Sequence, residues 1–441
     1  MLLVLVGGVV SANAGNVSVY IKPTEGWLNS SPFLGVWVYN SSDENNTKTW
    51  ATISSVSGQS GVYCATFADT QNKLIIVRLN PSGSDEDEPN WDNKWNQSAE
   101  LDIYPDKLYT ISSADDNSSA TITYLPWDFY FMSTKSGDWK IESKMENVSG
   151  NDYTCTFSGS EFAGKRVGWA SGDAFNTSGA IIDWGKKYQS TSTNAESSDH
   201  WITFKTFVYD SVVQGDGSAW KVPPTDNQYN DGTITIEFNS STGKTTIYSQ
   251  KDIAINGAQF GDYYYATFSC KYDVAIPSDV KAYYASGTGD GKVTMSAFSN
   301  GIRSSEGAFL RLPEASRTYT FSSTVSTDNP STNLLVPGTT SGLVAGDYVF
   351  AKQNNTVGFY KITSALGTDM TGRAYIAAAS VTAPALNIEF EDGETTGIYR
   401  IEANEFQQNS SNGQMYDLQG RRVVEPSKGI YIVNGKKVII K

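Results

Sequence analysis

The chain has 441 residues, of which 39% are hydrophobic, 12% aromatic and only 18% charged, and its formal net charge is −14. The length suits about three domains, and so many aromatic residues supply apolar area for several cores, which argues against bulk disorder. The negative charge argues against nucleic acid and anionic membrane surfaces as partners, because both need clustered Lys and Arg.

The chain opens with an apolar run, LLVLVGGVV at residues 2–10, followed by the small-x-small triplet Ala12-Asn13-Ala14. This pattern is typical of a signal peptide and its cleavage site, so we expect residues 1–14 to be removed on export to the extracellular space or the cell surface. The basic segment that normally precedes such a run is missing, which suggests either a truncated start or an internal Met at position 1. No later run reaches the length of a transmembrane helix.

Residues 16–125 are predicted to form a first β-sandwich module. Apolar or alternating runs occur at 16–22, 33–39, 61–67 and 73–79, separated by Gly, Pro, Asn and Asp clusters. Such runs predict half-buried strands, and no window carries a capped helical stripe. Many short strands within one such segment are typical of a sandwich.

A degenerate repeat predicts a second, homologous module at residues 126–250. VSGQSGVYCATF in the first half is matched by VSGNDYTCTF in the second, and each follows a tryptophan, Trp50 or Trp139, at a similar distance. Both modules end on two alternating runs around a polar turn, closing at Tyr124 and Tyr248, which is the pattern of a hairpin. All eleven tryptophans lie in these modules.

From residue 251 the sequence no longer contains tryptophan, but strand-like runs continue to 385–390. These runs predict a third β domain of unknown role at 251–395. A polar linker then leads to a short tail, together residues 404–441, with an Asn434-Gly435 hairpin turn. The expected fold is therefore all-β: tandem β-sandwich modules, a third β domain and a small C-terminal β tail.

Three cysteines, Cys64, Cys155 and Cys270, cannot form a closed set of disulfides. Each lies close to a Thr-Phe pair on a predicted strand. We therefore expect one free, buried thiol in each of the three cores.

The tail carries the most specific pattern, YDLQGRRV from Tyr416 and KGIYIV from Lys428. It resembles the C-terminal sorting domains of type IX secretion cargo, which carry a Y-D-x-x-G-x-x-V strand, a later G-I-Y strand and a basic end. The resemblance implies that the secretion machinery recognises Tyr416, Asp417, Gly420, Gly429 and Tyr431. The alternative is a plain terminal hairpin that completes the third domain.

The first module opens with VYIK at 19–22, then Trp27 and WVY at 37–39. This opening resembles that of small starch-binding modules, the β-sandwich carbohydrate-binding families appended to amylases. The resemblance implies a platform of a strand aromatic and one or two tryptophans for a glucan. Residues 128–139, ending on Trp139, would be the equivalent opening of the second module, and residues 251–395 resemble the β domain that precedes sorting tails.

Glycan binding would use aromatic rings beside polar residues, because sugar C–H faces stack on flat apolar surfaces. Trp91 and Trp95 stand four apart among amide and charged groups, either on one strand face or in one helical turn. The competing interpretation is that one ring of such a pair fills the core. Trp37, flanked by valines, favours the core, whereas Trp27 follows Glu25-Gly26 and is expected to be exposed. The full candidate set is Trp27, Trp37, Trp91, Trp95, Trp139, Trp184 and Tyr188.

Catalytic and metal chemistry find little support. His200 is the only histidine, which excludes multi-His metal sites, and its polar neighbours predict an exposed loop. Asp85 and Asp87 belong to an acidic run that could hold calcium, but the run lacks a turn glycine, so a solvated loop is favoured. No phosphate-binding loop occurs and no cofactor is expected.

The leading hypothesis is a non-catalytic, exported polysaccharide-binding protein, with a starch-like α-glucan as the first substrate. A surface adhesin or structural protein with no glycan site is the alternative. A β-sandwich glycosidase or lyase is the third, because paired carboxylates are not excluded by composition.

Overall fold

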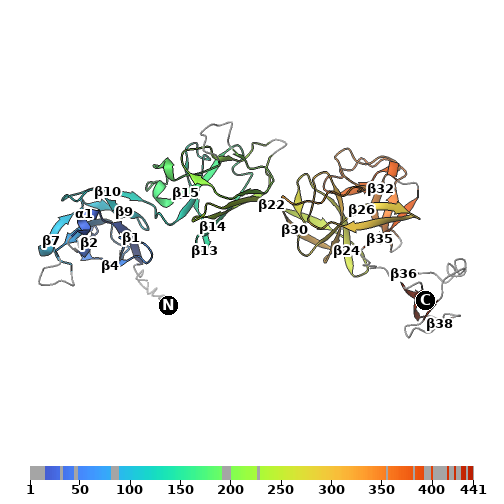
Figure 1. Cartoon of the computed structure of the whole chain (residues 1–441), viewed down its shortest axis with the longest axis horizontal. Helices are drawn as coiled ribbons and strands as arrows, with labels where there is room; N and C mark the ends of the chain where they lie inside the picture. Colours follow the sequence, from blue (N-terminus) through green and yellow to red (C-terminus); the bar gives the residue numbers. More distant parts are fainter. Residues whose placement is uncertain are drawn as a thin grey trace, which may run out of the picture.

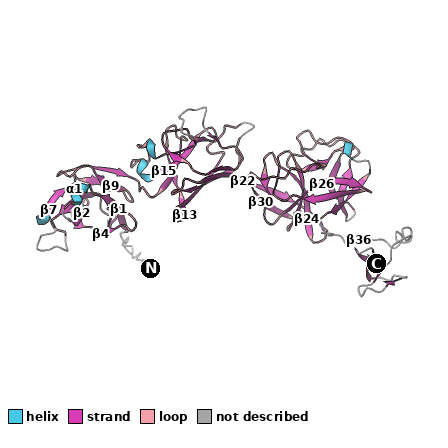
Figure 2. Cartoon of the chain, viewed as in Figure 1, coloured by secondary structure: helices cyan, strands magenta, loops and turns pink. Residues whose placement is uncertain are grey.

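Four β units follow one another along the chain in the computed structural model (Figure 1). The structure describes residues 15–29, 33–43, 48–80, 89–190, 200–225, 229–353, 356–380, 383–391, 399–400, 415–416, 422–423, 429–433 and 436–440. Within these residues the only α-helix is the single turn α1 (Glu25–Leu28), and strands make up most of the rest (Figure 2). The predicted all-β, multidomain fold class is confirmed. The expected signal peptide, residues 1–14, lies outside the described residues.

Module 1, residues 16–125, is a sandwich of two sheets. One has the order β10-β9-β1-β5-β4 and the other β3-β2-β6-β7, with β8 pairing β6. The strands are β1 (Asn16–Lys22), β2 (Phe33–Tyr39), β3 (Thr49–Trp50), β4 (Thr52–Ser55), β5 (Tyr63–Ala68), β6 (Lys73–Leu79), β7 (Lys94–Gln97), β8 (Leu101–Asp102), β9 (Leu108–Ile111) and β10 (Ala120–Thr123).

Alternation along these strands decides which side chains fill the core of module 1. In β2 the even-numbered residues Leu34, Val36 and Val38 are buried between the sheets, so the odd-numbered residues, Trp37 among them, point to the outer face. The core continues through the inward residues of β1, β5, β6 and β9.

Module 2, residues 126–250, repeats this plan. Its sheets have the orders β12-β11-β15-β20-β17 and β13-β14-β21-β22-β18, and β16 pairs β19 beside them. The strands are β11 (Phe129–Ser133), β12 (Lys140–Lys144), β13 (Glu146–Ser149), β14 (Asp152–Ser158), β15 (Arg166–Ser171), β16 (Tyr188–Gln189), β17 (His200–Trp201), β18 (Phe207–Tyr209), β19 (Val213–Gln214), β20 (Trp220–Lys221), β21 (Thr233–Asn239) and β22 (Thr245–Asn256).

The two modules differ at one strand. In module 1, β1 lies between β5 and the closing hairpin strand β9, whereas in module 2 the corresponding strands β14 and β21 pair directly. From the sequence, residues 128–139 were expected to be equivalent to the opening of module 1. In strand order, however, β11 takes the place of β2, and module 2 has no counterpart of β1 among the described residues.

The third domain contains a ten-stranded sheet, β23-β24-β29-β26-β27-β35-β33-β32-β34-β31, and the small pair β25-β28. Aromatic and aliphatic side chains form two separate cores in it, one on each side of the shared strands β24 and β29. The strands are β23 (Ala258–Phe260), β24 (Tyr263–Ser269), β25 (Val274–Ala275), β26 (Lys281–Gly289), β27 (Lys292–Ala297), β28 (Gly301–Ile302), β29 (Gly307–Leu312), β30 (Ser316–Ser322), β31 (Leu335–Pro337), β32 (Tyr348–Gln353), β33 (Thr356–Lys361), β34 (Ala374–Ile376) and β35 (Ala385–Phe390).

Strand β22 joins module 2 to the third domain without a linker. Its first half pairs with β21 of module 2, and its second half pairs with β30 of the third domain over seven residue pairs, Gln250↔Ser322 to Asn256↔Ser316. The boundary expected between residues 250 and 251 therefore falls inside a strand. Phe204 reinforces this joint, because it leaves module 2 and is buried in a core of the third domain.

The tail strands form a small sheet together with β36, which lies just before the expected start of the linker at residue 404, in the order β36-β40-β39-β37-β38. Within it Tyr416 is half-buried and Tyr431 is buried, whereas Asp417 and Gly420 of the sorting pattern lie outside the described residues. The strands are β36 (Tyr399–Arg400), β37 (Met415–Tyr416), β38 (Arg422–Val423), β39 (Gly429–Val433) and β40 (Lys436–Ile440).

The three cysteines are free, but they are not equally buried. Cys155 lies inside module 2, where burial raises the pKa of its thiol to about 12. Cys64 was expected in a core, yet it is only half-buried, because it alternates with the inward residues Ala65 and Phe67 and lies on the outer face of β5. Cys270 is also half-buried, at the edge of a third-domain core.

Candidate functional site: two aromatic clusters

Three tryptophans meet on the outer face of module 1. Trp37 of β2 pairs across the strands with Trp50 of β3, and their ring centroids lie 5.1 Å apart. Trp91, which begins the 3-10 turn η1 (Trp91–Asn93), completes the set at 5.7 Å from Trp37 and 5.3 Å from Trp50. We call these three residues the Trp91 cluster. Trp91 keeps 38% of its surface exposed, so the cluster presents an apolar ring to solvent.

Two local features hold the cluster in place. Gly35 leaves room for the Trp50 indole, since a Cβ at this position would lie 2.7 Å from Trp50 Cζ3. Asn90 caps η1 by accepting hydrogen bonds from the backbone amides of Asp92 and Asn93, which fixes the turn that carries Trp91. The cluster is thus built by packing and capping within module 1.

Polar side chains are carried by the strands next to the cluster. Lys94 and Gln97 of β7 pair with the outward residues of β6, and Lys94 Nζ donates to Gln97 Oε1 at 3.1 Å. Tyr39 lies on the same face of β2 as Trp37, about 7 Å further along the strand. Burial, with the adjacent Glu100 carboxylate, raises the pKa of Tyr39 to about 12, so its hydroxyl stays neutral. These groups could donate to and accept from sugar hydroxyls.

Trp95 does not join the Trp91 cluster. The segment is neither one strand nor one helical turn: Trp91 begins η1, and Trp95 lies in the strand β7 that follows. Its ring instead stacks on Arg78, whose guanidinium carbon lies 4.7 Å from the ring centroid. Although Trp95 is 39% exposed, it therefore stands apart from the three rings of the Trp91 cluster.

Two candidate residues belong to the cores. Trp27 was expected to be exposed, but its exposure is 0%, because Thr24 caps the single turn α1 and directs the indole between the sheets. Tyr188 is buried in the core of module 2, where its ring stacks on Trp169 at 5.9 Å and contacts Phe238 at 4.5 Å. Neither ring can stack on a sugar without unfolding.

Module 2 carries a related cluster. Trp139 precedes β12, and Trp184 begins the 3-10 turn η3 (Trp184–Lys186), with ring centroids 6.2 Å apart. Asp183 caps this turn, as Asn90 caps η1 in module 1. The ammonium of Lys187 lies 5.6 Å from the Trp139 ring and 5.4 Å from the Trp184 ring. Trp139 and Trp184 thus occupy the places of Trp50 and Trp91.

The module 2 cluster is less open than that of module 1. Both of its tryptophans are half-buried. The residues after β15, including Ala174 and Phe175, pack over the outward side chains Tyr130 and Met132 of β11, and Trp139 packs against the same group. The Trp91 cluster is therefore the more accessible of the two.

Sequence reasoning missed Trp50, which it used only to mark the repeat. The available signal was the alternation in β2: with Val36 and Val38 inside, Trp37 and Gly35 must face outward, and Gly35 leaves a gap that a large ring can fill. The ring that fills this gap, Trp50, comes from the separate strand β3, so the alternation in β2 alone does not identify it.

The remaining candidate features are His200 and the acidic run that contains Asp85 and Asp87. His200, expected in an exposed loop, begins β17 and is half-buried, with its ring 5.8 Å from that of Tyr209. No group of three or more His, Cys, Asp or Glu placed to hold a metal ion occurs among the residues that the structure describes, and Asp85 and Asp87 lie outside them. None of the described helices has the length and apolarity needed to cross a membrane.

The partly exposed rings, packed edge-to-face or tilted, and their polar neighbours make a surface suited to a hydroxyl-rich ligand. Comparison with protein-family models, with curated proteins and with solved structures gives no match for this chain.

Proposed function

We propose that the protein is a non-catalytic binder of neutral polysaccharide, with a starch-like α-glucan as the first ligand. The observation that carries the proposal is the Trp91 cluster. In it the partly exposed indole of Trp91 packs against two other indoles at the outer face of module 1. The cluster of Trp139 and Trp184 serves as a second, weaker site in module 2.

The energetics of stacking fit a weak, repeated site. A sugar face that covers about 40–60 Å² of apolar surface gains roughly 1–1.5 kcal/mol. A millimolar site requires about 4 kcal/mol, which two stacked faces and a few hydrogen bonds at about 1 kcal/mol each can supply. Two such sites on one chain then raise the affinity for a polymer by linkage.

Affinity electrophoresis in gels with starch, with xylan or with no polymer tests the proposal. Wild-type protein should be retarded by starch, and Trp91→Ala should weaken its binding about tenfold, because one stacking face is lost. Trp95→Ala is the matched control, since its ring is equally exposed but lies outside the cluster. Trp184→Ala measures the contribution of module 2.

Equal mobility of the wild-type protein in all three gels would refute polysaccharide binding. An equal loss in Trp91→Ala and Trp95→Ala would show that the Trp91 cluster is not the site. Retardation by xylan alone would keep the site and replace the ligand.

A surface adhesin or stalk is the second candidate function. The observation in its favour is the direct joint between module 2 and the third domain through the shared strand β22. A rod of packed modules would suit a protein that holds a binding surface away from a cell. Cell adhesion that persists in Trp91→Ala and is not inhibited by soluble starch would favour this function.

We also propose that the protein is exported and that its tail docks it at the cell surface. The tail sheet, separate from the third-domain sheet, supports this role, because a small β unit can be recognised by strand addition. Deleting residues 415–441 should retain the protein inside the cell, while normal export of the deletion variant would refute the role.

A further inference from the structure

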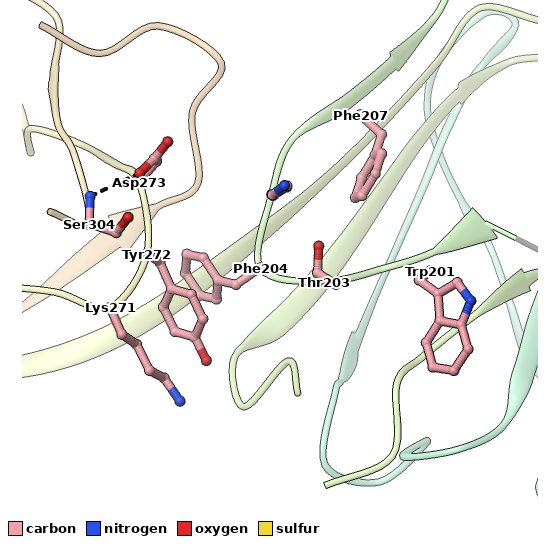
Figure 3. Close-up of a pocket in the computed structure, with 9 residues that line it drawn as sticks. Trp201, Thr203, Phe204, Phe207, Lys271, Tyr272, Asp273 and Ser304 are labelled. Carbon is pink, nitrogen blue, oxygen red and sulfur yellow. Dashed lines mark hydrogen bonds between the residues drawn. The ribbon is translucent and has the colours of Figure 1, made fainter. Parts of the chain in front are cut away.

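A cavity of about 510 Å³ lies where module 2 meets the third domain. Module 2 contributes Trp201, Thr203 and Phe207, and the third domain contributes Lys271, Tyr272 and Asp273 (Figure 3). Ligand pockets of roughly 300–1,000 Å³ are commonly found at domain interfaces, with aromatic walls and a few placed polar groups. The cavity has this size, place and composition.

Its aromatic walls are fixed rather than incidental. Phe204 and Tyr272 stack across the joint, with ring centroids 4.1 Å apart and planes 11° apart, and both are buried. The Tyr272 hydroxyl donates a hydrogen bond to Asp231 Oδ1 at 2.8 Å, which fixes the orientation of the ring. Trp201, on the module 2 side of the cavity, has the Lys221 ammonium 5.1 Å from its ring centroid and still keeps 40% of its surface exposed to a ligand.

Two lysines give the cavity a positive character that is unusual in a chain of net charge −14. Lys205 is exposed and has no ion-pair partner among the described residues. Lys271 reaches Asp231 only at 3.5 Å, while Lys251 binds the same carboxylate oxygen at 2.6 Å. Two ammonium groups thus share the Asp231 carboxylate, and that of Lys271 also lies 4.8 Å from the Tyr272 ring centroid.

Asp273, the acidic residue that lines the cavity, already accepts a hydrogen bond from the protein. Asp273 Oδ1 accepts a hydrogen bond from the Ser304 backbone amide at 2.9 Å, which ties it to the wall. Around the cavity, the ammonium groups of Lys205, Lys251 and Lys271 stand against the carboxylates of Asp231 and Asp273, so one positive charge remains and favours an anion. The exposed face of Trp201 favours a ring beside that anion.

We propose that this cavity binds an acidic saccharide, a pyranose that carries a carboxylate or a sulfate, with its ring on Trp201 and its anion between Lys205 and Lys271. The cavity shares no residue with the Trp91 cluster, so the proposal does not depend on glucan binding in module 1. The fixed joint through β22 keeps the two walls in register.

Calorimetry on the full chain, with tetragalacturonate, a sulfated neutral tetrasaccharide and maltotetraose as probes, tests this site. We expect binding of the carboxylated or the sulfated probe, and the one that binds identifies the anion. Trp201→Ala and the double variant Lys205→Gln/Lys271→Gln should each weaken it by about tenfold or more, because a stacking face or charge-assisted hydrogen bonds are lost.

The double variant Lys244→Gln/Lys352→Gln is the matched control, since it removes the same charge from exposed positions outside the cavity. It and Trp91→Ala should bind the acidic probe as the wild-type protein does. No binding of either acidic probe would overturn the proposal. So would an equal loss in the control variant, which would indicate non-specific attraction, or acidic-probe binding that survives Trp201→Ala and Lys205→Gln/Lys271→Gln.

Discussion

Phe204 belongs to module 2 in sequence, but its side chain packs in a core of the third domain. Truncating this side chain should show which of the two domains it stabilises. The side chain is 3% exposed and packs within the core formed by residues of β24, β26, β29 and β30. We expect Phe204→Ala to destabilise the third domain more than module 2.

The magnitude follows from the packing. Phe-to-Ala substitutions in cores cost about 3–5 kcal/mol, and a lost aromatic stack adds about 0.5–1.5 kcal/mol. Domains are stable by only about 5–15 kcal/mol, so the third domain should lose a large share of its stability. At about 1.4 kcal/mol per factor of ten, a loss of 3 kcal/mol raises the open population about a hundredfold.

Hydrogen exchange followed by mass spectrometry can locate this loss. Exchange should rise in the third-domain strands β26 and β29 and should change little in β14 and β15 of module 2, which lie away from the joint. Phe207→Ala is the matched control, because this ring is only half-buried and packs against the module 2 core. It should raise exchange in module 2 alone.

The reasoning is refuted if Phe204→Ala raises exchange only in module 2. It is also refuted if Phe204→Ala and Phe207→Ala raise exchange in the same strands, because Phe204 would then not belong to a core separate from that of module 2.

Three further predictions concern single sites. Gly35→Val should push Trp50 out of the Trp91 cluster, weakening starch retardation while costing about 1–3 kcal/mol in urea denaturation; unchanged retardation would contradict the role of Gly35. Trp27→Ala should cost about 3–5 kcal/mol in the same assay, and a cost near zero would show that the ring is not a core residue. Burial raises the pKa of the Cys155 thiol to about 12, so it stays protonated and should resist alkylation up to about pH 10, whereas the half-buried Cys64 should react first; equal rates in native protein would contradict this order.

Strand positions in module 1 followed closely from the sequence. The runs at 16–22, 33–39 and 73–79 match β1, β2 and β6 residue for residue, because alternation along a half-buried strand is a local signal. The run at 61–67 differs from β5 by only a few terminal residues. Local periodicity was enough at these places.

The tryptophans were harder to place, because their exposure depends on distant partners. Trp27 looked like a loop residue, but a one-turn helix capped by Thr24 turns it inward. Trp37 looked like a core residue between two valines, although the same alternation that buries those valines points it outward. Trp50 gains its role from pairing with Trp37 across strands, which no local pattern reveals.

The joint at Phe204 was beyond sequence reasoning for the same reason. Its ring stacks on that of Tyr272, which lies far away in the sequence and in another domain. Nothing in the surrounding residues marks it as a member of another domain's core. The neighbouring cavity is lined by residues of both domains, so no local sequence pattern predicts it.

Packed joints also bear on how weak sites could hold a polymer. Tyr20 of module 1 contacts Trp127 of module 2 at 5.6 Å between ring centroids, and Thr123 forms a bridge with Asn176. A flexible linker would dilute the second binding event as it lengthens, whereas a packed joint keeps the Trp91 and Trp184 surfaces at a fixed spacing. Avidity would then be high for chains whose sugar repeat matches that spacing and absent for short oligosaccharides. On this view the packing between modules selects the ligand as much as the rings do.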